Sequence, residues 1–212
     1  MKSIIVRLLN LLFGIALSAL GVVITLRANI GYAPWEVFHV GIAKTTGMTI
    51  GVASIIVGIV IVVIVTVLGE TLGLGTLASM VLTGVFIDLI IFFDFIPMAG
   101  NFAIGLVMLV AGLFTLAFGS YFYIRSAFGV GPRDNLMVIL ARKTKLPVGA
   151  CRGIVEGSAT FVGWLMGGMA GIGTILAFIA ISFCVQIVFS AFRFDVTAIK
   201  HETLTDTFRL KR

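Results

Sequence analysis

Six apolar stretches follow one another along the chain, and each is long enough to cross a lipid bilayer. A helix of about 20 residues spans a hydrocarbon core of roughly 30 Å. The first stretch continues past the length of a cleaved signal peptide and lacks a small-residue cleavage site, so we expect it to remain as a membrane helix. The pattern predicts an all-α polytopic membrane protein with long helices over residues 8–26, 48–68, 74–93, 102–124, 146–167 and 172–192.

Two polar segments, each directly after a long apolar stretch, share one pattern. Residues 27–36 read RANIGYAPWE and residues 125–134 read RSAFGVGPRD. In both, Arg is followed by Gly four residues later, Pro seven later and an acid nine later. Proline suits the first turn of a helix, and an acid there complements the positive end of the helix dipole. The pattern therefore predicts two short helices, over residues 34–46 and 132–144.

The offset of 98 residues between these segments extends along much of the chain. Gly14 matches Gly112 and Gly21 matches Gly119, while GETLGLGT at 69–76 aligns with GGMAGIGT at 167–174. Matched glycine, proline and arginine are informative because they determine backbone geometry and charge position. We therefore predict two tandem homologous repeats, residues 1–101 and 102–193, each with three long helices and one short Gly-x-x-Pro-x-acid helix. A polar tail, residues 194–212, follows.

Three crossings in each repeat would give the two repeats opposite orientations, the inverted arrangement common among secondary transporters. With a cytoplasmic N-terminus, twelve of the 15 Lys and Arg residues lie on the cytoplasmic side, Arg27 and Lys44 lie outside, and Arg152 lies within a helix. That bias agrees with the positive-inside rule and places both termini in the cytoplasm. An alternative with eight crossings and parallel repeats has the same bias. We prefer inverted repeats, because irregular backbone inside a membrane needs burial in protein or a cavity.

Composition supports a membrane protein without enzymatic chemistry. The chain is 60% hydrophobic and 11% charged, whereas about 25% of an ordinary soluble protein is charged. The net charge of +6 fits cytoplasmic flanks, so we do not expect nucleic acid to bind. Cys151 and Cys184 lie in apolar stretches without a Cys/His cluster, so no cofactor or metal is expected. No Ser/His/Asp set, paired histidines or Walker loop indicates an enzyme.

Two placements of the short helices remain open. They could lie at the membrane surface, with Trp35 as an aromatic anchor. Alternatively, they are half-helices whose starts converge on a binding site, since helix ends supply ligands for ions and solutes. In the second placement, Glu36 and Asp134 are paired carboxylates that meet a cation, an amine or a coupling proton.

A further charged pair lies inside a long apolar stretch. Glu156 is near the middle of its stretch, and Arg152 precedes it by one helical turn. The two either form an ion pair along one helix face or mark a functional site, because charge at membrane depth is costly. The predicted substrate-binding residues are Trp35, Glu36, Arg133, Asp134, Asn135, Arg152 and Glu156. The predicted backbone-shaping residues are Gly31, Pro34, Gly129, Gly131 and Pro132.

Three stretches of the sequence resemble a known family. They are ANIGYAPWEVFHVGIAKTTGMTIGVASIIVG, the GLGT turn with the FIDL that follows it, and GVGPRDNLMVILARKTKLPVG. They resemble the YczE-like bacterial membrane proteins, a group related to the YitT proteins, over nearly the whole chain. The resemblance implies a bacterial inner-membrane protein of about this size and implies no particular mechanism.

Together these patterns predict a small transporter embedded in the lipid bilayer. Its substrate would be a small polar or charged solute, bound between the two repeats. Either one chain encloses the pathway or two chains pair as a homodimer. The alternatives are a non-transporting accessory or scaffold protein of the membrane and a solute-capture subunit of an ATP-driven importer.

Overall fold

The computed structural model describes residues 4–69, 72–129 and 131–194, and its regular structure in these ranges is entirely helical. Both short helices have their predicted bounds, and every long helix begins and ends within four residues of its predicted stretch. The described helices are α1 (Ile4–Arg27), α2 (Pro34–Thr46), α3 (Ile50–Val67), α4 (Leu74–Phe93), α5 (Phe102–Arg125), α6 (Pro132–Thr144), α7 (Val148–Leu165) and α8 (Ile172–Ala191).

Five of these helices, α1, α3, α4, α5 and α8, are long and apolar enough to cross a membrane. We predicted six, but α7 is not among the five, because Arg152 and Glu156 lower the hydropathy of its 18 residues. Large apolar side chains face outward on the long helices, including Val63, Val107 and Phe183. A bilayer solvates such surfaces, and the chain is therefore a multi-pass membrane protein.

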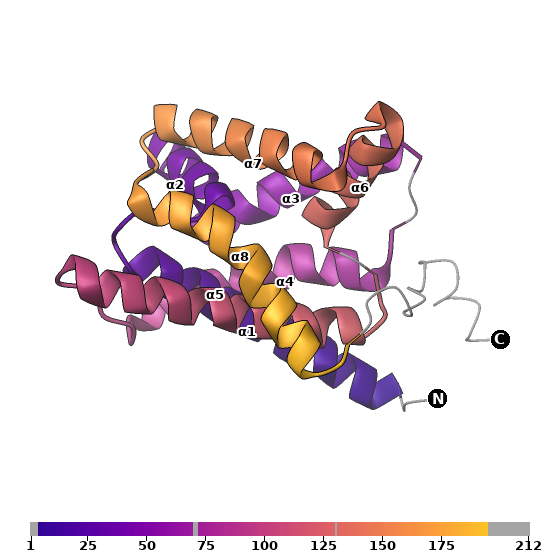
Figure 1. Ribbon diagram of the computed structural model, residues 1–212, viewed down its shortest axis with the longest axis horizontal. Coiled ribbons are helices and arrows are strands. Elements are labelled where there is room, and N and C mark those ends of the chain that lie inside the picture. The colour runs from indigo at the N-terminus through magenta and orange to yellow at the C-terminus, as the bar shows by residue number, and fades with distance from the viewer. Residues whose placement is uncertain (1–3, 70–71, 130, 195–212) are drawn as a thin grey trace.

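The centre of the bundle is a close antiparallel crossing of α1 and α5, which lie side by side in Figure 1. Glycines allow the two backbones to approach. A Cβ atom at Gly14 would lie 2.5 Å from the backbone nitrogen of Tyr123, and one at Gly21 would lie 2.8 Å from the carbonyl oxygen of Gly112. Small residues at a helix crossing permit such contact, as is common in membranes.

Two hydrogen bonds connect the beginnings of α4 and α8 to distant parts of the chain. The N–H of Gly173, in the first turn of α8, donates to the carbonyl oxygen of Ile30 at 2.8 Å. The N–H of Gly75, in the first turn of α4, donates to the carbonyl oxygen of Phe128 at 2.8 Å. The segment after α1 thus contacts the start of α8, and the segment after α5 contacts the start of α4. We call these two bonds the crossed junctions.

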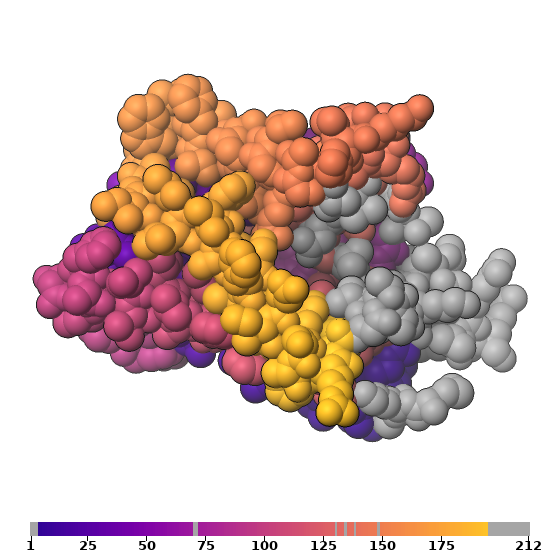
Figure 2. Space-filling model, in the orientation of Figure 1, coloured from indigo at the N-terminus to yellow at the C-terminus, as the bar shows by residue number. Residues whose placement is uncertain are grey.

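The two helix pairs α3–α4 and α7–α8 differ in their packing. α3 packs directly on α4, whereas no comparable packing joins α7 to α8 within the described residues. An apolar groove of about 510 Å³ lies between α7 and α8, lined in part by Gly153, Gly157 and Phe178. Figure 2 shows α8 running obliquely across this face of the molecule, with α7 along one edge.

Asp88 on α4 holds the beginning of α3. Its carboxylate accepts hydrogen bonds from the Thr49 hydroxyl and from the N–H of Gly51, the latter at 2.8 Å. The first N–H groups of a helix have no acceptor within the helix. We therefore expect Asp88→Ala to lower the free energy of unfolding by about 1–2 kcal/mol, the usual cost of losing a cap. Thermal denaturation of the detergent-solubilised protein measures this.

Asp94→Ala is the matched control for that experiment. Asp94 pairs with Arg27, but its side chain is 68% exposed, and exposed ion pairs contribute roughly 0–1 kcal/mol. Equal losses in the two variants would contradict the assigned role of Asp88.

Candidate functional site

The local chemistry of the two short helices places their beginnings inside the bundle. Gly31 and Gly129 have φ angles of +118° and +130°, a region that glycine enters without steric cost. These residues turn the chain back after α1 and α5. Pro34 and Pro132 then begin α2 and α6, as predicted. Most of the first two turns of α2 is buried within the bundle, Trp35 included; the position of α2 relative to the membrane surface stays a prediction.

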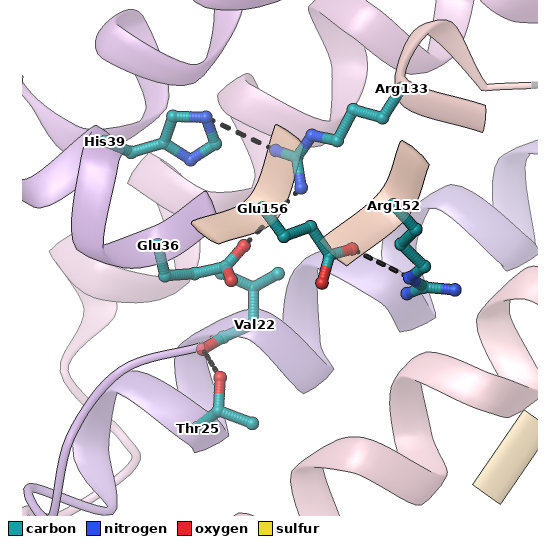
Figure 3. A network of polar contacts seen from close by, with 7 residues as sticks. All are labelled: Val22, Thr25, Glu36, His39, Arg133, Arg152 and Glu156. Atoms are coloured by element: carbon teal, nitrogen blue, oxygen red, sulfur yellow. Dashed lines mark hydrogen bonds and ion pairs between the residues drawn. The ribbon is translucent and has the colours of Figure 1, made fainter. Parts of the chain in front are cut away.

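The beginnings of α2 and α6 line one cavity of about 250 Å³. Five of the seven predicted substrate-binding residues are in its wall: Trp35, Glu36, Arg133, Arg152 and Glu156. Figure 3 shows the side chains of Glu36 on α2 and Arg133 on α6 approaching each other, while that of Glu156 on α7 points toward Arg152. The structure thus brings charged residues from separate parts of the sequence to one space. Their role in binding remains a prediction.

Among the described charged side chains of the two short helices, Glu36 is the most enclosed. Its side chain is 7% exposed, and the nearest guanidinium nitrogen of Arg133 lies 3.7 Å from its carboxylate. The same guanidinium lies over the Trp35 ring, 4.8 Å from the ring centroid. The helix that carries Glu36, α2, is not one of the five helices that are long and apolar enough to cross a membrane. Burial raises the pKa of the Glu36 carboxyl; the charge of Arg133 opposes this rise, and that of Glu156 adds to it.

His39 orients Arg133 from the other side. One guanidinium nitrogen of Arg133 lies 3.3 Å from Nε2 of His39. Because a guanidinium can only donate, Nε2 is the acceptor and the imidazole proton is on Nδ1. Burial, with a contribution from the Arg133 charge, holds the pKa of His39 well below its usual value. His39 is therefore a neutral acceptor that positions Arg133 between itself and Glu36.

Arg152 and Glu156 form the ion pair along α7 that the sequence left as one of two alternatives. Nε of Arg152 donates to Oε1 of Glu156 at 2.9 Å, and the Glu156 side chain is 5% exposed. Both residues also line the cavity. The pair is therefore intrahelical, and it also contributes one charge of each sign to the cavity wall.

The remaining predicted residues divide into three groups. Gly131 and Pro132 line the cavity, whereas Gly31, Gly129 and Pro34 are not in its wall. Asn135 is also not a lining residue; it follows Arg133 by two positions, and residues so spaced do not share a helix face. The side chain of Asp134 lies outside the described part of the structure, as does the predicted tail beyond Phe194.

Sequence reasoning missed six hydroxyl residues in the cavity wall: Ser18, Ser54, Ser79, Thr83, Ser120 and Tyr123. Isolated hydroxyls inside apolar helices were the only signal available. That signal is weak, because a serine in a helix often bonds to the backbone of the preceding turn. Ser79 does so, donating to the carbonyl oxygen of Thr76 at 3.0 Å.

The described cavity offers donors, acceptors and both signs of charge to a small polar molecule. Small-molecule sites typically measure about 300–1,000 Å³, so a cavity of about 250 Å³ suits a compact ligand. Among the described residues, no group of three or more His, Cys, Asp and Glu side chains is placed to hold a metal ion.

Comparison with known proteins identifies relatives across most of the chain. Residues 5–190 match the model of a family of unknown function, DUF6198. The uncharacterised membrane protein YczE of Bacillus subtilis is 36% identical over 166 residues, which cover 77% of this chain and 76% of that protein. An uncharacterised protein of Haemophilus influenzae is 30% identical over 176 residues, which cover 83% of this chain and 80% of that protein.

A third relative, the uncharacterised protein YyaS of Bacillus subtilis, is 25% identical over 166 residues, which cover 77% of this chain and 82% of that protein. No solved structure matches the chain. The resemblance inferred from the sequence motifs is thus confirmed at the level of the family. The chain belongs to the DUF6198 family of unknown function, as a multi-pass membrane protein homologous to YczE.

Proposed function

We propose that this protein moves a small polar or charged solute across a bacterial inner membrane, which it crosses six times, with α7 as the sixth span and both termini in the cytoplasm. The observation that carries the proposal is the charged cavity at the beginnings of α2 and α6. Helix beginnings and irregular backbone at the interface of two halves form the substrate sites of many secondary transporters. Buried charge inside a membrane is costly and usually functional.

An inverted-repeat arrangement forms part of the proposal, and the crossed junctions support it. The donors Gly75 and Gly173 are 98 residues apart, and so are the acceptors Ile30 and Phe128. The same exchange of partners would follow from a two-fold axis that relates the two repeats. The antiparallel crossing of α1 and α5 also supports inverted over parallel repeats, because parallel repeats would place these equivalent helices in the same direction.

The difference between the two helix pairs fits a transporter that alternates between two states. α3 packs on α4, whereas a groove separates α7 from α8. In inverted-repeat transporters, one repeat or bundle moves against the other around a fixed site. Equivalent pairs in two different packing arrangements are what one state of such a cycle would contain.

Solute efflux from proteoliposomes tests the proposal. Vesicles would be loaded with an equal mixture of sugars, polyols, amino acids, amines and organic acids, and the solutes retained after dilution would be measured by mass spectrometry. We expect at least one solute to leave faster than from protein-free vesicles. Glu36→Gln should reduce that excess by roughly tenfold or more, because bonds to charged groups contribute about 1.5–3 kcal/mol.

Asp94→Asn is the matched control, since Asp94 is an exposed carboxylate that is not in the cavity wall. Its efflux should equal that of the unmodified protein, and a thermal denaturation curve for each variant would establish that it is folded. If no solute of any class left faster than from protein-free vesicles, transport would be contradicted. The accessory protein or importer subunit would then be favoured.

A further inference from the structure

We infer that the ligand of the cavity is a small zwitterion, a molecule carrying one ammonium and one carboxylate or similar anionic group. The inference rests on the proposed function because it concerns the ligand of the same cavity. It narrows the solute from any small polar molecule to one that carries both a positive and a negative charge. Three observations carry it: the balance of charge among the described side chains of the cavity wall, the separation of Glu36 from Arg133, and the buried indole nitrogen of Trp35 beside Arg133.

The described charged side chains in the wall are two carboxylates and two guanidiniums. Glu36 and Glu156 are both buried, with side chains 7% and 5% exposed. A ligand with a net charge would leave one charge uncompensated in this enclosed space, which is strongly unfavourable. A zwitterion adds one charge of each sign and keeps the site balanced.

The contact between Glu36 and Arg133 is longer than a direct hydrogen bond, so each group retains hydrogen-bonding capacity for a ligand. Their separation is 3.7 Å, whereas a charge-assisted hydrogen bond between nitrogen and oxygen measures about 2.7–2.9 Å. By contrast, Arg152 and Glu156 are already in direct contact at 2.9 Å. A ligand ammonium can donate directly to the Glu36 carboxylate, while the ligand anion accepts from the Arg133 guanidinium.

Trp35 supplies a further donor near that position. The indole nitrogen of Trp35 is buried and has no hydrogen-bond partner among the described residues, and its ring lies against the Arg133 guanidinium. A buried donor without an acceptor is unfavourable. An anionic group bound at Arg133 would bring an acceptor to this side of the cavity.

Other ligand classes fit less of the wall. A sugar or polyol could bond to the six hydroxyls. It carries no charge, however, and would not account for four charged side chains in the wall of a cavity inside a membrane. A simple amine would use the carboxylates and leave the guanidiniums with one added positive charge, and a simple acid would do the reverse. The small volume, about 250 Å³, limits the zwitterion to a compact molecule such as a small amino acid.

A binding measurement separates these classes without relying on transport. Thermal denaturation of the detergent-purified protein would be followed with five zwitterions: glycine, L-alanine, L-serine, β-alanine and sarcosine. The matched single-charge probes are ethylamine, ethanolamine, propionate and lactate. We expect at least one zwitterion to raise the denaturation midpoint in a saturable way, because a ligand of the folded state stabilises it by mass action. The single-charge probes should leave it unchanged at equal concentration.

Variants of the cavity wall should test the contact made by each end of the ligand. Glu36→Gln and Arg133→Gln should each weaken zwitterion binding by roughly tenfold or more, and Asp94→Asn should leave it unchanged. Absence of a shift with all five zwitterions would overturn the inference, as would an equal shift with an amine or an acid. If an uncharged solute crossed in the efflux experiment without zwitterion binding, transport would stand and the inference would fail. Zwitterion binding without any efflux would support the inference and contradict transport.

Discussion

Gly14→Ala is expected to destabilise the protein by about 2 kcal/mol, within the range of 1–3 kcal/mol typical of overpacking. The added methyl group would lie 2.5 Å from the backbone nitrogen of Tyr123 and 2.8 Å from the carbonyl oxygen of Gly119. Both obstacles are backbone atoms of α5, so α1 and α5 would have to move apart. For a chain of this length, the denaturation midpoint should fall by roughly 4–8 °C, measured on detergent-solubilised protein.

Gly157→Ala provides the matched comparison for this crossing. Gly157 is also inside a helix, but no atom lies within 4 Å of a Cβ placed there. Alanine has a helix propensity about 1 kcal/mol better than glycine, so this variant should be unchanged or slightly more stable. Similar losses at both positions would show that the effect of Gly14→Ala comes from the loss of glycine itself and not from the crossing.

Arg133→Met is expected to lower the free energy of unfolding by about 3 kcal/mol. Removing one partner of a buried ion pair leaves the other charge uncompensated, which typically costs about 3–5 kcal/mol. We take the low end because the Arg133 side chain is 34% exposed. The second change Glu36→Gln removes the isolated charge and should recover much of the loss, so the two effects will not add. Additive losses in the double variant would contradict the pairing.

The pH dependence of the same variant follows from Glu36. Burial raises the pKa of its carboxyl in the folded protein, so Glu36 contributes stability below its unfolded pKa that is lost as pH rises through the folded pKa. Arg133 opposes that rise in pKa, and its removal should strengthen the effect. As pH rises above the ordinary glutamate pKa of about 4.3, Arg133→Met should therefore lose more of its stability than the unmodified protein does.

Arg27→Met is the control for both measurements on Arg133. Arg27 pairs with Asp94, which is largely exposed, so its loss should cost roughly 1 kcal/mol or less and should not change the pH dependence in this range. A variant of Arg133 that behaved like Arg27→Met would indicate that Glu36 is solvated in the folded protein.

Local chemistry made the helices predictable from the sequence. Pro34 and Pro132 each set a helix beginning through one residue's own backbone preference, and the predicted bounds of both short helices match the structure. The spacing of Arg152 and Glu156 also determined a contact, because residues four apart share a helix face. These inferences required no knowledge of how the helices pack.

The residues that line the cavity were harder to predict from the sequence, because they depend on which helix faces meet. The approach of Arg133 to Glu36 joins residues 97 positions apart, and no local pattern specifies that distance. Asn135 was predicted for the site from its position in the motif alone, yet the cavity is lined by other positions of α6. The hydrogen bonds from Thr49 and Gly51 to Asp88 likewise connect separate helices.

The crossed junctions have a consequence for how the protein is made. The first turn of α4 is bonded to Phe128, and the first turn of α8 supplies the donor for Ile30. During synthesis, α4 would enter the membrane before Phe128, which accepts its hydrogen bond, has been added to the chain. The carbonyl group of Ile30, just after α1, would gain its donor Gly173 later still. The amino-terminal part of the chain therefore cannot reach its final packing until residue 173 has been translated. Any nascent chain that stops earlier would leave these backbone groups without the partners that they have in the finished protein.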